Sequence, residues 1–244
     1  MIPLIPKEMW EFWLIKTPPH SLFAFIGMAV GVLFLIRMGR RQKIHPKIMI
    51  IESLWVFAGA WLGSKLLFYI GPYEACSSAG ILGIFNRGFV FYGGLFGGIL
   101  LGYVYTRINR YNFWKHLDFW GMAIPLEIFF ARIGCFFVND ALGRITGVWW
   151  AVKLPDGTAR HPVGLYLSFF NIVLFAHLYS GWHNRRFFGQ IFLKYLMVYS
   201  AGRFMIEFLR EYPFNYLGLT FSQWVSIVVF AVSSAIYLVK SRKV

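Results

Sequence analysis

Long apolar stretches alternate with short polar segments along this chain, and most of them approach the length that crosses a bilayer. About 20 apolar residues span the hydrocarbon core as a helix. We therefore expect about seven transmembrane helices, at residues 22–36, 48–70, 89–105, 117–138, 164–182, 189–209 and 221–239. The fourth contains Pro125, which lacks a backbone donor, so this helix is expected to be irregular.

The composition supports a membrane protein. Hydrophobic residues make up 58% of the 244 residues and charged residues only 14%, whereas about 25% are charged in a typical soluble domain. These values exclude a disordered chain, a fibrous repeat and a water-soluble globule. We expect an all-α polytopic membrane protein in which residues 1–244 form a single integral membrane domain.

Basic residues cluster after the first, third, fifth and seventh predicted helices. Because such clusters mark cytoplasmic loops, the C-terminus is expected in the cytoplasm and the N-terminus outside. The net charge of +14 has the same explanation, so no nucleic acid partner is expected. Residues 1–19 place Trp10 and Trp13 among charges, which predicts a helix in the outer interface. Residues 139–162 are expected to form an external loop.

Six charged residues lie in or near the predicted helices, namely Lys65, Glu127, Arg132, Lys194, Arg203 and Glu207. A charge at the bilayer centre costs about 2.5–3.5 kcal/mol on insertion scales, so such residues usually pair or line a wet cavity. Arg203 and Glu207 are four residues apart and share a helix face with Tyr199. An internal salt bridge would explain this pair alone, but six such charges favour a functional site.

Two segments add candidate phosphate ligands. The backbone N–H groups of Gly93 and Gly94 could hold a phosphate, although close helix packing is the alternative, as it is for Gly59 and Gly63. Residues 132–144 end a predicted helix with two arginines, whose planar guanidinium groups suit a phosphate. The chain has no CxxC pair, so no metal site is expected. The redox state of its two cysteines, Cys76 and Cys135, stays open.

Four motifs, in order, resemble those of the bacterial phosphatidylglycerol–prolipoprotein diacylglyceryl transferase family. Residues 132–144 resemble Arg-hydrophobic-Gly-Asn-Phe-x-Asn-Gly-Glu-x-x-Gly-Arg, and residues 199–210 resemble Tyr-x-x-x-Arg-Phe-x-x-Glu-Phe-x-Arg. Residues 89–97 are similar to Met-Ser-Phe-His-Gly-Gly-Leu-x-Gly, and residues 160–166 to His-Pro-x-Gln-Leu-Tyr. The matches extend over roughly residues 20–240.

The resemblance implies an enzyme of the bacterial cytoplasmic (inner) membrane. Its reaction moves the diacylglyceryl group of phosphatidylglycerol to the lipobox cysteine thiol of a prolipoprotein signal peptide, releases glycerol phosphate, and needs no metal or organic cofactor. The residues expected to carry catalysis are Arg132 and Arg203 on the phosphate, Glu207 orienting Arg203, Tyr92 and His161. The expected substrate-binding residues are Arg132, Arg203, Gly93, Gly94, Asn139, Asp140, Gly143, Arg144 and Tyr199.

The general base is the main departure from the family pattern. Tyr92 replaces the histidine that precedes Gly-Gly in the family. Tyrosine, with a pKa near 10 in water, is a weak base but can donate a hydrogen bond to phosphate. His161, Asp140 and His20 are candidate bases, unless Arg132 and the helix ends acidify the thiol enough that no base is needed. His161 could instead cap the fifth helix.

Two other functions stay open from the sequence. A same-fold protein could bind or move lipid without turnover, or a transferase could use the same lipid donor on a different acceptor. A channel or ion-coupled transporter is disfavoured, because the chain has no inverted repeat and its charges lie toward the outer end.

The alternation of basic clusters makes a topological prediction. A reporter fused after Val244 is expected in the cytoplasm, and one inserted near Gly157 is expected outside. Accessibility of the two reporters to a membrane-impermeant reagent measures this. Both reporters on the same side would contradict the seven-helix topology.

Overall fold

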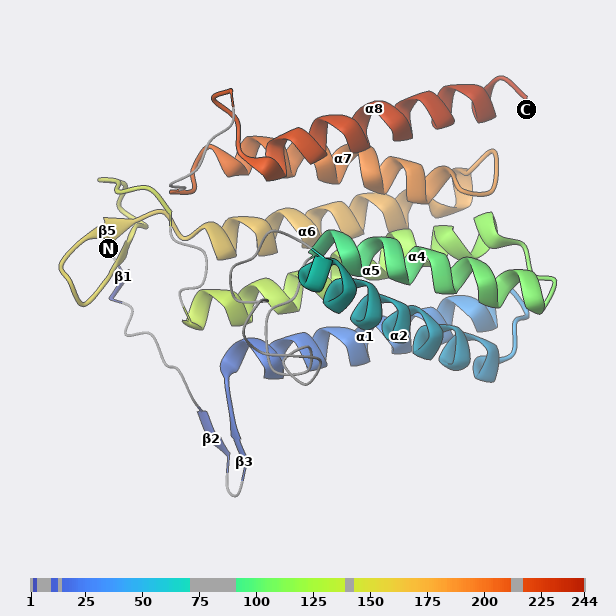
Figure 1. Ribbon diagram of the computed structural model, residues 1–244, viewed down its shortest axis with the longest axis horizontal. Coiled ribbons are helices and arrows are strands. Elements are labelled where there is room, and N and C mark those ends of the chain that lie inside the picture. Colours follow the sequence, from blue (N-terminus) through green and yellow to red (C-terminus); the bar gives the residue numbers. More distant parts are fainter. Residues whose placement is uncertain are drawn as a thin grey trace. The chain divides into compact units, whose positions relative to one another are not determined.

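The computed structural model describes residues 2–3, 10–12, 15–70, 91–138, 143–211 and 217–243. These residues fold mainly into helices (Figure 1). The chain divides into two compact units. Unit 1 comprises Met1–Phe34 and Leu117–Val244, and unit 2 comprises Leu35–His116.

Seven long helices occupy the described residues and lie within a few residues of the predicted ranges. They are α1 (Pro19–Arg41), α2 (Pro46–Ile70), α4 (Phe91–Ile108), α5 (Phe113–Val138), α6 (Val163–Ser180), α7 (Gln190–Glu207) and α8 (Phe221–Ser241). A short 3-10 helix, η2 (Gly181–Asn184), extends α6.

Five of these helices are long and apolar enough to cross a membrane: α1, α2, α5, α6 with η2, and α8. The protein is therefore a multi-pass membrane protein. The other two, α4 and α7, have 18 residues each, as α6 has without η2. Glycine and tyrosine lower the hydropathy of α4, and Lys194, Arg203 and Glu207 lower that of α7. Seven membrane spans, and the orientation of the termini, therefore stay a prediction.

The expected helix in the outer interface over residues 1–19 is wrong where this segment is described. β2 (Trp10–Phe12) pairs antiparallel with β3 (Ile15–Thr17). Apolar and charged residues alternate within β2, and this period of two is that of a strand. Trp13 lies outside the described residues.

The fourth predicted helix is also more regular than expected. α5 continues without a break through Pro125, so the expectation of an irregular helix is wrong. One proline removes a single backbone donor, and neighbouring helices can support such a site within a membrane bundle.

The expected external loop contains a small sheet, so the chain is not purely α-helical. β4 (Val152–Lys153) pairs antiparallel with β5 (Ala159–Arg160), and β1 (Ile2–Pro3) pairs parallel with β4. Gly157 turns the hairpin with a positive φ of 82°.

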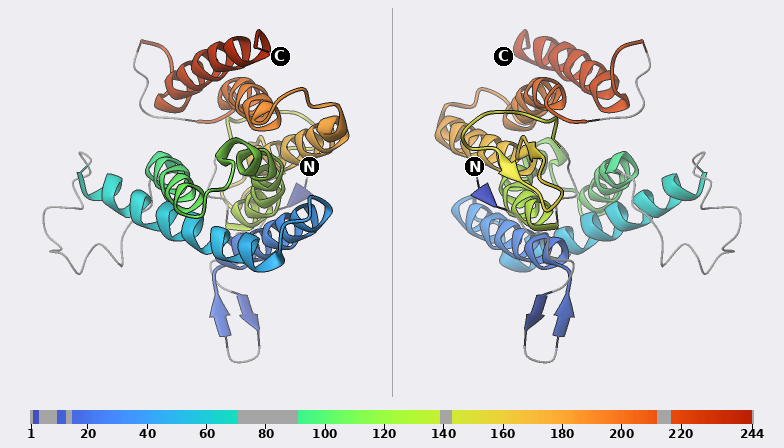
Figure 2. Two further views of the ribbon diagram at one scale, coloured as in Figure 1. Left: turned by 90° about the vertical axis from the view of Figure 1, so that its right-hand side faces the viewer. Right: turned by 90° about the vertical axis from the view of Figure 1, so that its left-hand side faces the viewer.

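Unit 2 is built on close contact between α2 and α4, which lie side by side (Figure 2). A Cβ atom added at Gly59 or Gly63 would overlap the backbone of Gly97 or Gly93. The expected packing role of Gly59 and Gly63 is therefore confirmed, and Gly93 takes part in the same contact. The backbones approach this closely only because no side chain intervenes.

A buried ion pair joins two other segments of unit 2. The Nδ1 atom of His116 lies 2.5 Å from the Oε2 atom of Glu52. The ring of Tyr111 stacks on that of His116 with 5.5 Å between centroids. This cluster fixes the start of α5 against the first turns of α2.

In unit 1, the helices α5, α6, α7 and α8 follow one another with alternating direction (Figures 1 and 2). A Cβ atom added at Gly121 would lie 2.8 Å from the Cα atom of Phe192, so α5 and α7 are in backbone contact. A Cβ atom at Gly164 would lie 3.2 Å from the carbonyl oxygen of Arg132, which brings the start of α6 against the end of α5.

The carboxylate of Asp118, from α5, caps the start of α7. Its Oδ1 atom accepts hydrogen bonds from the backbone N–H groups of Ile191 at 2.9 Å and Phe192 at 3.1 Å. Its Oδ2 atom accepts one from Gly189 at 2.8 Å. Asp118 is fully buried. It satisfies three of the backbone donors that a helix leaves unpaired at its start, and its negative charge suits that helix end.

This cap makes a stability prediction. Asp118→Ala leaves three buried N–H groups without an acceptor, and each lost partner costs about 1–3 kcal/mol. We expect the alanine variant to lose at least about 3 kcal/mol of unfolding free energy, and Asp118→Asn, which keeps one acceptor, to lose less. Denaturation of the purified variants in detergent measures the difference. Wild-type stability of the alanine variant would contradict this role of Asp118.

Candidate active site

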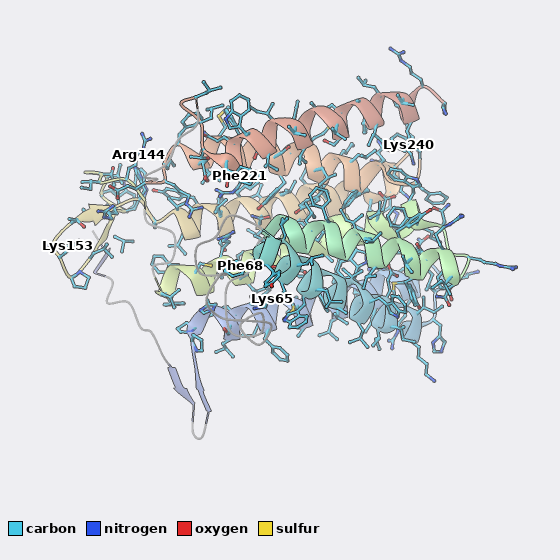
Figure 3. All side chains as sticks on the ribbon, in the orientation of Figure 1. Lys65, Phe68, Arg144, Lys153, Phe221 and Lys240 are labelled. Carbon is cyan, nitrogen blue, oxygen red and sulfur yellow. The ribbon has the colours of Figure 1, made fainter. Side chains whose placement is uncertain are left out.

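Most of the predicted site residues that the structure describes meet at one end of unit 1. We call it the site end; it comprises the last turn of α5, the first turn of α6, the last turn of α7, the first turn of α8 and residues 143–161. Arg144 and Lys153 lie at this end of unit 1, and Lys240 lies at the opposite end (Figure 3).

Glu207 is the centre of the charged cluster at the site end. Its side chain has 0% exposure and forms an ion pair with Arg203, one turn earlier on α7. The Nη1 atom of Arg210 lies 3.9 Å from its Oε2 atom. The shared face predicted for Arg203 and Glu207 is confirmed. The carboxylate holds both guanidinium groups at the end of α7.

The start of α8 also binds Glu207. The hydroxyl group of Thr220 donates to its Oε1 atom at 3.3 Å. Thr220 is also the N-cap of α8 and forms a capping box with Gln223, whose side-chain amide donates to the carbonyl of Phe204 at 3.4 Å. The contact with Thr220 was not foreseen, although Thr-x-x-Gln before an apolar run is the signature of a capping box.

Arg132 lies in the C-terminal half of α5, partly buried, with its Nη1 atom 3.8 Å from the Sγ atom of Cys135. Cys135 is a free thiol, and Cys76 lies outside the described residues. The backbone of Arg132 packs against Gly164, where the family motif has a glutamine. Replacement of that side chain by glycine lets α6 begin in direct contact with α5.

His161 precedes α6, and its ring faces another aromatic side chain. Its Nδ1 atom lies 3.1 Å from the hydroxyl oxygen of Tyr166, which accepts a hydrogen bond from Nε1 of Trp150 at 2.6 Å. The N-cap of α6 is Pro162, and no side chain caps this helix. The alternative in which His161 caps the helix is therefore wrong.

Backbone hydrogen bonds join His161 to the charged cluster. Its N–H group donates to the carbonyl of Arg144 at 3.1 Å, and the N–H group of Arg144 donates to the carbonyl of Leu209 at 2.9 Å. The Arg144 side chain donates from Nε to the carbonyl of Arg210 at 3.3 Å. A Cβ atom at Gly143 would overlap the carbonyl of His161, so only glycine allows this close approach.

Arg160 reinforces the same contact and was not predicted. Its Nη1 atom donates to the carbonyl of Gly143 at 3.1 Å and pairs with Glu211.

At the hairpin tip, hydrogen bonds from the Thr158 hydroxyl and N–H groups hold the pKa of Asp156 below its usual value. Asp156 therefore stays ionised through the neutral range and stiffens the turn.

Of the remaining predicted site residues, one is on α7, two belong to unit 2, and three are not described in full. Tyr199 is on α7, one turn before Arg203, and its ring packs between those of Tyr195 and Phe170. Gly93 and Gly94 lie on α4 in unit 2, where they pack against α2. The side chain of Tyr92 and all of Asn139 and Asp140 lie outside the described residues.

The family model for prolipoprotein diacylglyceryl transferase matches residues 9–239. The chain belongs to this family. The family predicted from the four sequence motifs is therefore confirmed. The protein is a transferase by family, as expected from the sequence.

Curated relatives named phosphatidylglycerol–prolipoprotein diacylglyceryl transferase match nearly the whole chain. The protein from Bordetella parapertussis is 34% identical over 87% of this chain and 88% of the relative. The protein from Campylobacter jejuni is 32% identical over 94% of this chain and 92% of the relative. The protein from Clostridioides difficile is 30% identical over 92% of each chain.

The buried carboxylate at the site end of this family member makes a prediction. In Glu207→Gln, the amide can still accept from Thr220 but no longer neutralises Arg203 and Arg210. Because loss of one partner of a buried pair costs about 3–5 kcal/mol, we expect partial unfolding or mislocalisation and lower activity of the folded fraction. Thr220→Val, which removes one neutral hydrogen bond, is the milder control. Equal effects of both changes on stability would contradict the central place of Glu207.

Proposed function

We propose that this protein transfers the diacylglyceryl group of phosphatidylglycerol to the lipobox cysteine thiol of prolipoproteins. The observation that carries the proposal is the buried Glu207 with Arg203 and Arg210 around the end of α7, where the backbone of residues 209–210 contacts residues 143–144 of the family motif. An exposed arrangement of these guanidinium groups would suit many anions. Their attachment to a buried carboxylate in a membrane helix suits the phosphate of a lipid.

The proposal includes a membrane arrangement. Both units form a single integral membrane domain of seven spans in the bacterial cytoplasmic membrane, with the N-terminus outside and the C-terminus in the cytoplasm. The site end then faces outside, where a secreted precursor presents its signal peptide. The basic residues at the opposite end of unit 1, Arg185, Arg186 and Lys240, support this orientation.

The reaction is a displacement at carbon. The thiolate sulfur attacks the glyceryl carbon that bears the phosphate oxygen, the carbon–oxygen bond breaks, and its electron pair leaves with glycerol phosphate. Arg132 and Arg203 stabilise the charge that grows on the departing phosphate, with Arg144 and Tyr199 beside them. The thiolate, not the thiol, is the nucleophile, so a proton must leave the cysteine before or during the attack.

His161 is the best placed of the described candidate bases. In the tautomer whose Nδ1–H group donates to the hydroxyl oxygen of Tyr166, the ring is fixed and the lone pair of Nε2 can accept the thiol proton. His20 lies in the first turn of α1 and is exposed, with only a 3.3 Å contact to Ser21. Tyr92 would then serve as a hydrogen-bond donor to the phosphate instead of as the base.

The two arginines test the phosphate site. Lysine keeps the charge but loses the planar pair of donors, so we expect Arg132→Lys and Arg203→Lys each to lower activity by about 100-fold, a loss of roughly 3 kcal/mol in transition-state stabilisation. The assay follows the consumption of phosphatidylglycerol with a lipobox peptide. Arg186→Lys, at the opposite end of unit 1, is the matched control.

Two outcomes would contradict this function. Full activity of both lysine variants would make the arginines structural. Purified wild-type protein that binds phosphatidylglycerol but never modifies the peptide, and fails to replace the transferase in a depleted strain, would make the protein a lipid-binding relative.

The pH dependence of the rate tests the base. An imidazole base must be neutral to accept the proton, so the rate is expected to rise through about pH 6–7 in the wild type. His161→Gln is expected to lose this rise of the rate with pH and most of the activity. Tyr166→Phe is expected to keep the rise with a smaller amplitude. A wild-type profile in His161→Gln would remove His161 from the mechanism.

A further inference from the structure

Glu127 is a carboxyl group in the middle of α5 that the mechanism above does not use. It faces α1, where a Cβ atom added at Gly31 would overlap its carboxyl group and one at Gly27 would lie 2.7 Å from its carbonyl oxygen. Gly31 therefore makes room for this side chain, and Gly27 lets α1 approach the backbone of α5. Its Oε1 atom is buried and has no hydrogen-bond partner in the part of the chain that the structure describes.

The surroundings of Glu127 favour a neutral carboxyl group. An ionised carboxylate inside a membrane helix needs a cation or several donors nearby, and among the described residues none donates to the Oε1 atom of Glu127 or pairs with it. A protonated carboxyl group differs from a carboxylate because it can donate a hydrogen bond. Glu127 is thus a donor without a described acceptor.

Helix geometry relates Glu127 to Arg132. Five residues correspond to a rotation of about 140° and a rise of about 7.5 Å, so the two side chains flank a strip of α5. The strip consists of Ile124, Ile128, Ala131 and Cys135, and all four are partly exposed in the structure. Arg132 reaches over this strip, since its Nη1 atom contacts Cys135.

The neighbouring face of α7 continues this arrangement. Tyr195 is buried, and its ring lies 5.5 Å from that of Tyr199. Tyr195, Tyr199 and Arg203 are spaced by four residues and share a face. Donor groups therefore extend from the phosphate-binding arginines to the depth of Glu127.

A glycerophospholipid has the complementary order of groups. Its phosphate is an anion at the membrane surface, and its ester carbonyl oxygens, which only accept hydrogen bonds, lie deeper. An apolar strip between an arginine and a buried donor matches this order, with the acyl chains over the apolar side chains. Neither a free phosphate nor a soluble anion would need the deeper donor.

We propose that Glu127 determines lipid specificity by donating a hydrogen bond to an ester carbonyl oxygen of the phospholipid donor, about 7.5 Å deeper than Arg132 along α5. The choice of phosphatidylglycerol as that lipid rests on the proposed function. The hydrogen bond itself requires only that a diester lipid bind along the strip.

The test compares two lipids that differ only at this position. Diester phosphatidylglycerol and its dialkyl ether analogue, which lacks the carbonyl oxygens, are titrated separately onto the purified full chain without peptide. We expect the wild type to bind the diester about fivefold more tightly, as one hydrogen bond allows. Glu127→Leu is expected to bind both lipids equally, and Glu127→Gln, whose amide N–H donates, to keep the preference.

Two further variants make the test independent of folding defects. Gly31→Ala adds a methyl group that displaces the Glu127 carboxyl without removing it, and is expected to reduce the preference. Asn171→Leu removes another buried polar side chain of unit 1, on α6, and is expected to keep it. An unchanged preference in Glu127→Leu or Gly31→Ala, or its loss in Glu127→Gln or Asn171→Leu, would overturn the proposal.

Because the titration contains no peptide, its outcome is separate from that of the transfer assay. Wild-type protein with a diester preference but no transfer would contradict the proposed function and leave the role of Glu127 supported. Wild-type protein that catalyses transfer but has no diester preference would support the proposed function and contradict the role of Glu127.

Discussion

The arrangement of the site end depends on compensating one buried anion, the carboxylate of Glu207. A fully buried charge is tolerated only when its neighbours supply both opposite charge and hydrogen bonds. Arg203 on α7 and Arg210 just after its end supply the charge, and Thr220 supplies a hydrogen bond from the start of α8. These contacts of Glu207 therefore fix the end of α7 against the start of α8, and they hold two guanidinium groups in place before any substrate binds. Such preorganisation is what a phosphate leaving group needs.

The same helix is secured at its other end by a second buried carboxylate. Asp118 accepts three backbone hydrogen bonds where α7 begins, and Arg185 beside it lies over the ring of Trp182 at 3.6 Å. α7 is one of the least apolar of the long helices, because it carries the charges of the site. Its buried apolar residues, Ile191, Phe192, Leu193 and Tyr195, all lie in its first half. In the second half, which carries the charges, the buried residues are Ser200 and Glu207, so polar contacts hold that half in place.

Sequence reasoning succeeded where a contact lies within one helix and failed where it joins distant segments. The ion pair of Arg203 and Glu207 follows from a spacing of four residues, and the helix ranges follow from hydropathy. Two contacts depend instead on how separate segments of the fold meet. They are the contact of Thr220 with Glu207, 13 residues apart, and the contact of Trp150 with Tyr166. No local period encodes them. The hairpin of β2 and β3 was missed for another reason, since aromatic and charged residues suit an interfacial helix as well as a strand.

Tyr92 replaces the family histidine, and we propose that His161, in the segment before α6, is the base instead. The backbone around His161 supports this proposal. His161 bonds to Arg144, which bonds to Leu209 beside Glu207. Only one short extended segment, residues 143–146, therefore separates the proposed base from the cluster proposed to bind phosphate. A displacement of that segment would move both together, which keeps the base in register with the leaving group. Gly143 permits this arrangement, because any side chain at this position would overlap His161 and push the segment away from the end of α7.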